Sequence, residues 1–178
     1  TVIGTYKTSA NGSFTVTGLE AGTYVVEELA SDSGHVIDTA PQTAYISGKE
    51  QDVVELYFGN SPKGSLLIKK IDASTREPLS DVQFFVTESN GTVVGDSNGY
   101  FTTDSAGTIL IEGIDPGTTL VAKETIAKEG YLLDDTPQTA EIKAGQTVTL
   151  EFRNQPKGSL VINKLDSVTH KPLEGVEF

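Results

Sequence analysis

Short runs in which apolar and polar residues alternate recur along the chain, and such alternation predicts strands that bury one face. Turn-forming clusters such as SNGT, GDSNG, DSAG and DPG separate these runs. No segment keeps a helical period of apolar residues over three turns. The pattern therefore predicts an all-β protein, whose strands in the central part of the chain we expect at 65–71, 82–87, 100–103, 108–112, 118–125, 138–143 and 147–153.

The chain also repeats itself. The segment NSPKGSLLIKKID begins at Asn60 and returns, little changed, as NQPKGSLVINKLD from Asn154. Other stretches recur with the same order, since 22–46 matches 117–142 and 66–84 matches 160–178. Internal repetition of this kind is typical of tandem domains.

The repeats set the expected domain boundaries. Residues 62–155 form one complete repeat. Residues 1–61 are the C-terminal part of a preceding repeat, and residues 156–178 are the N-terminal part of a following one. A repeat of about 94 residues with seven short strands has the size of an immunoglobulin-like β-sandwich.

Three predicted strands of the complete repeat each end an apolar face with one polar residue, which is Lys70, Glu124 or Asn154. A buried unpaired charge costs several kcal/mol, so a single residue of this kind usually reaches solvent at the strand end. The recurrence of all three instead predicts that they meet inside the fold. The partial repeats hold the same types at Lys164, Glu28 and Asn60.

Lys, Glu and Asn side chains that are buried together can react with one another. Burial depresses the pKa of an amine and makes it nucleophilic, and it favours the neutral form of a carboxyl group, which can then shuttle protons. Attack of the amine on the Asn amide carbon expels ammonia and leaves an amide cross-link. Since groups held in contact react at high effective molarity, no external enzyme is needed.

The complete repeat resembles the Cna B-type (SpaA-like) domains of Gram-positive surface adhesins and pilins. The resemblance rests on KGSLLIKKID and PLSDVQF at the front, KETIAKEGY in the middle and LEFRN at the end. It implies an immunoglobulin-like, transthyretin-like (prealbumin-like) β-sandwich with an autocatalytic Lys–Asn isopeptide bond. By position, the bond joins Lys70 to Asn154 with Glu124 as the catalytic proton shuttle. Lys128 stands where the family's middle motif, Glu-Thr-x-Ala-Pro-x-Gly-Tyr, has Pro.

The two partial repeats hold complementary parts of this chemistry. The first has Glu28 and Asn60, within an altered middle motif EELASDSGH, and the last has Lys164. Within one chain the two parts flank the complete repeat. We therefore expect the last partial repeat of one chain to complete the first of another, with a Lys164–Asn60 cross-link and head-to-tail strings. Truncation of a longer repeat protein is the simpler explanation.

Composition narrows the function classes. The chain has no Cys, which excludes disulfides and thiolate chemistry, and its net charge of −12 disfavours nucleic acids and anionic membranes. His35 and His170 are too few for a catalytic or metal cluster, so we expect no metal, no cofactor and no conventional hydrolase. DSNG (96–99) lacks the other acidic positions of a calcium loop and is interpreted as a turn.

The leading functional hypothesis is a structural stalk segment of a Gram-positive adhesin or pilus-like protein. Such a segment is not an enzyme, because its only reaction would be a single turnover that cross-links the segment itself. Its partners would be neighbouring repeats of the same protein. The alternative is a binding module whose loops, such as 95–107, recognise a host extracellular-matrix protein or glycan. Lys63 and Lys157 lie in SPK and QPK segments and are interpreted as linker residues. We expect an extracellular, wall-anchored protein, although the sequence shows no signal peptide, sorting signal or membrane-spanning run.

Overall fold

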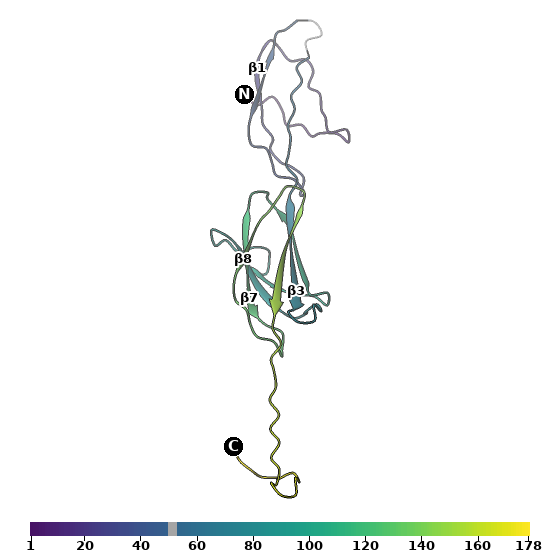
Figure 1. Ribbon diagram of the computed structural model, residues 1–178. Coiled ribbons are helices and arrows are strands. Elements are labelled where there is room, and N and C mark those ends of the chain that lie inside the picture. Colours follow the sequence, from purple (N-terminus) through teal and green to yellow (C-terminus); the bar gives the residue numbers. More distant parts are fainter. Residues whose placement is uncertain (50–52) are drawn as a thin grey trace. The chain divides into compact units, whose positions relative to one another are not determined.

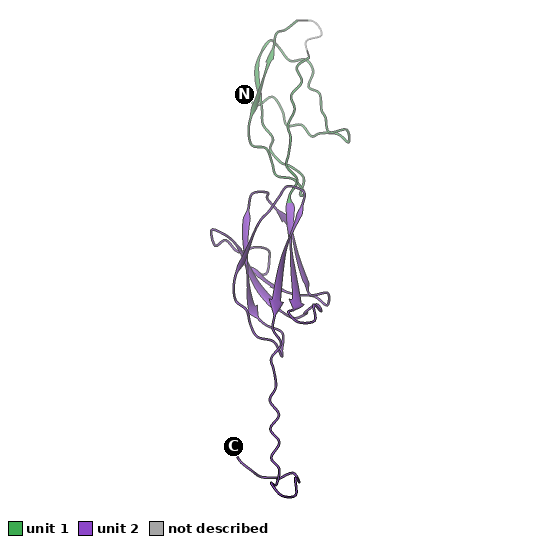
Figure 2. Cartoon of the chain, in the orientation of Figure 1, with its two compact units in different colours: residues 1–63 green, residues 64–178 purple. Residues whose placement is uncertain are grey.

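The chain divides into two compact units. The computed structural model describes residues 1–49 and 53–178, and these residues form unit 1 (Thr1–Lys63) and unit 2 (Gly64–Phe178) (Figure 2). Every regular element of the described residues is a strand. The predicted all-β class is confirmed, and each unit is considered separately.

Unit 2 contains two sheets that face each other (Figure 1). In the first, the order is β6 (Thr108–Ile114), β3 (Gly64–Asp72), β9 (Thr147–Asn154). In the second, the order is β5 (Tyr100–Thr102), β4 (Gln83–Glu88), β7 (Thr119–Ile126), β8 (Gln138–Glu141). The strands β3 and β9 run parallel, whereas the other paired strands of unit 2 are antiparallel. The topology thus places the first strand of the unit beside its last.

Alternate residues of these strands build the core between the sheets. Phe84 of β4 and Phe152 of β9 meet edge to face, with ring centroids 4.8 Å apart. Full burial of one such side chain contributes about 1.5–3 kcal/mol. The buried apolar residues of unit 2 are Leu66, Ile68, Leu79, Val82, Phe84, Val86, Val94, Ile109, Ile111, Leu120, Ala122, Ala140, Ile142 and Phe152.

All seven strands predicted from alternation are present in unit 2, with ends that differ from the prediction by at most two residues. The segment 95–99, which includes DSNG, is a turn as expected. Gly99 in this turn has a φ of +81° and lies against the Val86 carbonyl, where an added Cβ would come within 2.8 Å. A glycine is therefore required to bring the turn against β4.

Unit 1 contains one antiparallel pair, β1 (Gly22–Val26) and β2 (Gln42–Ile46). Tyr24 faces Ala44 across this pair, as Leu120 faces Ala140 across β7 and β8. The segment 53–60 is the counterpart of β9 by sequence, yet it is not a strand. In unit 2 the strand β9 pairs with β3, and the described residues of unit 1 contain no counterpart of β3.

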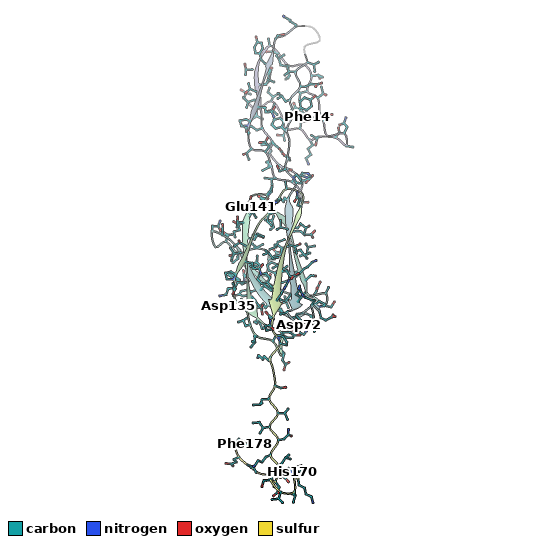
Figure 3. All side chains as sticks on the ribbon, in the orientation of Figure 1. Phe14, Asp72, Asp135, Glu141, His170 and Phe178 are labelled. Atoms are coloured by element: carbon teal, nitrogen blue, oxygen red, sulfur yellow. The ribbon has the colours of Figure 1, made fainter. Side chains whose placement is uncertain are left out.

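Residues 157–178, called the tail here, belong to neither sheet of unit 2. Leu160 and Ile162 are 84% and 58% exposed, whereas Leu66 and Ile68, their counterparts in β3, are fully buried. Phe178, labelled in Figure 3, is likewise 84% exposed. The tail therefore has the sequence of a first strand without the contacts of one.

Candidate functional site

The three polar residues predicted to meet in unit 2 come from strands on both sheets. Lys70 lies near the end of β3, and Asn154 is the last residue of the neighbouring strand β9. Glu124 lies on β7 in the facing sheet, where it pairs with Phe84 of the neighbouring strand β4. Alternation places all three side chains on the inner faces, as the sequence predicted.

The three side chains form a closed ring of hydrogen bonds. Lys70 Nζ donates to Glu124 Oε2 at 2.6 Å and to Asn154 Oδ1 at 2.5 Å. Asn154 Nδ2 donates to Glu124 Oε1 at 2.6 Å. Each oxygen of the Glu124 carboxylate therefore faces a different nitrogen, one on the amine and one on the amide.

This ring is sealed from solvent. Lys70 is 1% exposed, and Glu124 and Asn154 are fully buried. Among the described residues, every buried polar side-chain atom has a hydrogen-bond partner. The ion pair between Lys70 and Glu124 offsets part of the large cost of burying both charges.

Aromatic rings form the apolar wall of the site. The Lys70 amine lies 5.9 Å from the ring centroids of both Phe84 and Phe152. Burial lowers the pKa of this amine below its ordinary value of 10.5, and the hydrogen bond and charge of Glu124, with the charge of Asp134, offset part of that shift. Relative to an exposed lysine, the site therefore favours the neutral, nucleophilic amine.

Asp72, which the sequence pattern did not single out, and Tyr131, the last residue of the middle motif, fix the end of β3 beside the site. Asp72 pairs with Asn154 across β3 and β9, and it is 4% exposed. Its carboxylate accepts hydrogen bonds from the backbone N–H groups of Ser74 and Thr75 and from Tyr131 Oη at 2.8 Å. The recurrence of Asp72 as Asp166 was the signal that could have identified it.

Unit 1 contains the Glu and Asn of the same arrangement. Asn60 Nδ2 donates to Glu28 Oε1 at 2.6 Å, the distance found between Asn154 and Glu124, and also to Ser31 Oγ at 2.9 Å. The backbone N–H of Asp38 donates to Glu28 Oε2 at 3.3 Å and to Asn60 Oδ1 at 3.2 Å. The sequence pattern gave no indication of this backbone contact.

The remaining predicted site residue, Lys164, lies in the tail and is exposed. The Lys164–Asn60 bond joins residues of different units and stays a prediction, as does the Lys70–Asn154 bond. Within the described ranges, no three His, Cys, Asp or Glu side chains gather in a way that could hold a metal ion. The described residues also include no helix long and apolar enough to span a membrane.

Solved structures of bacterial proteins, pilins among them, resemble the chain. The Bacillus anthracis TIE protein is 27% identical with a TM-score of 0.51, and the match covers 84% of this chain and 28% of that one. GBS52, the minor pilin of Streptococcus agalactiae, is 24% identical with a TM-score of 0.49, over 88% and 69%. The shaft pilin SpaA from Lactobacillus rhamnosus GG is 20% identical with a TM-score of 0.48, over 87% and 70%.

The chain thus spans little more than a quarter of the TIE protein. No curated protein matches the chain significantly. The family model of the SpaA prealbumin-like fold domain matches residues 1–62 and again residues 64–156. That family is one of structural domains rather than enzymes. Two consecutive matches cover most of the sequence, and the chain therefore belongs to the SpaA prealbumin-like fold domain family.

Proposed function

We propose that the chain is a load-bearing stalk segment of a Gram-positive surface protein, and that an isopeptide bond between Lys70 and Asn154 locks unit 2. The observation that carries this proposal is the buried ring of Lys70, Glu124 and Asn154, with each contact between 2.5 and 2.6 Å. Two consecutive domains of one structural family support a stalk in preference to a catalyst.

The ring contains the parts required for amide exchange. Glu124 Oε2 accepts a proton from the Lys70 ammonium, and the resulting neutral amine attacks the amide carbon of Asn154. The carboxyl group then delivers a proton through Oε1 to the departing Nδ2, which leaves as ammonia, and Glu124 takes up the second proton that the attacking nitrogen loses as it becomes the amide N–H. One C–N bond forms as another breaks, and no oxidant, metal or cofactor takes part.

The sheet topology indicates what such a bond would do under load. Because β3 and β9 are parallel, the start of β3 and the end of β9 lie at opposite ends of the pair. Tension entering at Gly64 and leaving after Asn154 would pass along residues 64–70 and then across the bond. Residues 71–153 would carry no load, so the sandwich could not be pulled open.

A cross-link of this kind would serve where other exported domains use disulfides. The chain has no Cys, and covalent reinforcement of small β domains is common outside the cell. The match to the SpaA prealbumin-like fold domain family supports a place outside the cell, on the surface of a Gram-positive bacterium. Neighbouring domains of the same stalk are its expected partners.

Intact mass under denaturing conditions tests the proposal. The wild-type monomer should be lighter than its sequence by one ammonia, and digestion should give a branched peptide that contains Lys70 and Asn154. Lys70→Met should restore the full mass, whereas Lys69→Met, on the exposed side of the same strand, should still lose ammonia. A full-mass wild type, or ammonia loss without the branched peptide, would overturn the proposed bond.

Glu124→Gln separates the shuttle from the nucleophile. The Gln side chain keeps the size of Glu124 and one of its two acceptor oxygens, but it cannot take up the amine proton. Loss of general acid–base catalysis typically slows a reaction by about 10²–10⁴-fold. We expect this variant to fold with its full mass and to lose ammonia only slowly, as followed by mass spectrometry over days.

A further inference from the structure

We propose that Asp72 and Tyr131 form a latch that positions Asn154 for attack by Lys70. The latch consists of the Asp72 carboxylate, the Tyr131 hydroxyl and the turn that follows β3. Neither residue takes part in the exchange of bonds, so both are positioning residues. The inference rests on the cross-linking reaction proposed above, and it identifies what holds the acceptor of that reaction in place.

Of the three residues of the site, Asn154 has the weakest support from the sheets. Lys70 lies in the central strand β3, and its backbone also bonds to Gly107 and Leu79, at 2.8 and 2.9 Å. Glu124 lies within β7, between β4 and β8 in its sheet. Asn154 is the last residue of the edge strand β9. Because strand ends at a sheet edge open most readily, Asn154 depends on contacts beyond the strand ladder.

One backbone hydrogen bond holds the Asn154 carbonyl from the side of β3. The Ala73 N–H donates to this carbonyl at 2.9 Å. Ala73 lies in the turn after β3, so the direction of its N–H depends on that turn. The Asp72 carboxylate fixes the turn, because its Oδ1 accepts the backbone N–H groups of Ser74 and Thr75 at 2.6 and 2.8 Å. The position of Asn154 therefore depends on the Asp72 side chain.

Tyr131 ties this turn to the loop that follows β7. Its hydroxyl donates to Asp72 Oδ2 at 2.8 Å. The backbone N–H groups of Thr75 and Ser74 and the Tyr131 hydroxyl lower the pKa of Asp72, and the bond to Asp72 raises the pKa of Tyr131. The proton thus stays on the hydroxyl and the charge on the carboxylate. A hydrogen bond to an ionised acceptor is stronger than one between neutral groups.

The loop that contains Tyr131 also contacts the chain just after Asn154. The Leu132 N–H donates to the Gln155 carbonyl at 2.9 Å, and Tyr131 forms a backbone bridge with Pro156. We call these two contacts the bracket. The Tyr131 hydroxyl therefore joins the bracket, which holds the residues after Asn154, to the turn, which holds Asn154 itself.

Both the bracket and the turn recur elsewhere in the chain, where Tyr131 takes no part. In unit 1 the Val36 N–H donates to the Ser61 carbonyl at 2.9 Å, which repeats the bracket, and His35 stands at the position of Tyr131. In the tail, the Asp166 carboxylate accepts the backbone N–H groups of two later residues, which repeats the turn. What the Tyr131 hydroxyl adds in unit 2 is the connection between the two.

The latch acts on the reaction through geometry. Lys70 Nζ must reach the amide carbon of Asn154, and a misplacement of about 1 Å can slow a reaction between positioned groups by about 10²-fold. Loss of the Tyr131 hydroxyl releases the turn, so that Ala73 no longer holds Asn154 in place. We expect Tyr131→Phe to slow ammonia loss by about 10–100-fold. Its pH dependence should stay unchanged, because Lys70 and Glu124 still exchange the protons.

The test follows the rate of ammonia loss in the full chain. The chain is made by cell-free synthesis, synthesis is stopped, and aliquots denatured in acid at intervals are analysed by intact mass. Tyr131→Phe and Asp72→Ala should both react slowly, and the double variant should be no slower than Asp72→Ala, because both changes break the same latch. Asp72→Asn should react at close to the wild-type rate, since Asn can accept the N–H groups of the turn and donate to the Tyr131 hydroxyl.

A control variant separates positioning from loss of stability. Ile142→Val removes a buried methyl group from a side chain that lies against Gly64, at the opposite end of β3 from the site. The loss lowers stability without touching the latch, so this variant should keep the wild-type rate. Equal slowing by Ile142→Val and Tyr131→Phe would overturn the proposal, and so would a wild-type rate in Tyr131→Phe.

Hydrogen exchange tests the latch without the covalent bond. In the Glu124→Gln background, adding Tyr131→Phe should speed exchange of the Ala73 amide by about tenfold or more, the factor that corresponds to loss of a hydrogen bond to a charged group. Exchange of the Leu132 amide should stay unchanged, because unit 1 forms the equivalent bond with His35 in place of tyrosine.

The two readouts separate this inference from the proposed function. Unchanged exchange of the Ala73 amide would overturn the latch even if the reaction slows. A wild-type chain that keeps its full mass would contradict the proposed Lys70–Asn154 bond, while faster exchange of the Ala73 amide would still support the latch.

Discussion

Units 1 and 2 contain the same Glu–Asn pair at the same distance, but a different group completes each site. In unit 2 the third group is the Lys70 amine, and in unit 1 it is the backbone N–H of Asp38. The Glu–Asn pair therefore assembles without the Lys strand. What the strand adds is a nucleophile at the two oxygen atoms that the Asp38 N–H otherwise contacts.

The two units also differ in their cores. Among the described residues, unit 1 buries only Ala44 of its hydrophobic side chains, whereas unit 2 buries a continuous cluster between two sheets. The strand β3 lies at the centre of the first sheet of unit 2 and pairs with both β6 and β9. The strand β3 thus supplies the centre of the sheet, part of the core and the Lys70 amine. The same strand that completes the fold of unit 2 therefore also completes its reactive site.

The largest expected effect comes from breaking unit 2 at the proposed cross-link. Residues 70 and 154 are 84 positions apart, and closing a loop of that size stabilises a domain by about 4–5 kcal/mol in the chain-entropy model. Lys70→Met should therefore lower the melting temperature of unit 2 by roughly 20–30 °C. Differential scanning calorimetry measures the change.

Lys69→Met is the matched control, because Lys69 lies on the exposed side of β3. It should shift the melting temperature of unit 2 by no more than a few degrees. Equal melting of the wild type and Lys70→Met would mean that unit 2 gains nothing from a covalent bond.

The sequence predicted most of unit 2 because its signals are local or repeated. Alternation located all seven strands, and the recurrence of Lys70, Glu124 and Asn154 on inward faces identified the three residues that meet. The sequence could not predict the contact of the Asp38 backbone N–H, because a backbone N–H has no side-chain pattern that marks it. The Asp38 N–H contacts the Glu–Asn pair in unit 1, whose described residues include no Lys strand.

The contact between Asp72 and Tyr131 was missed for a related reason. The two residues are 59 positions apart, and Asp72 by itself reads as a turn residue at the end of a strand. Only the fold shows that its carboxylate is buried and accepts the Tyr131 hydroxyl. Unit 1 has His35 where unit 2 has Tyr131, and His35 pairs with Asp32 instead.

Removing the Tyr131 hydroxyl tests how much the contacts at the end of β3 contribute to the difference in stability between the units. Tyr131→Phe deletes a hydrogen bond to a buried carboxylate, which typically costs about 1.5–3 kcal/mol. We expect the melting temperature of unit 2 to fall by roughly 6–20 °C. Tyr100→Phe removes an exposed hydroxyl from β5 and should leave it nearly unchanged. An equal, small effect of both changes would show that the Asp72–Tyr131 bond does not stabilise unit 2.

The smallest expected effect is a dependence of unit 2 on acid. Hydrogen bonds from the Thr75 and Ser74 backbone and from Tyr131 lower the pKa of Asp72 below its ordinary value of 3.8. The stability that this carboxylate contributes is therefore complete above pH 3.8 and is lost as the pH falls through its folded pKa. Asp72→Asn cannot ionise, so its melting temperature should fall less than that of the wild type between pH 4 and pH 2. Because unit 1 has no counterpart of β3 among its described residues, the difference in acid dependence between the wild type and Asp72→Asn should be confined to unit 2. Parallel melting profiles of the two proteins in acid would contradict the assignment to Asp72.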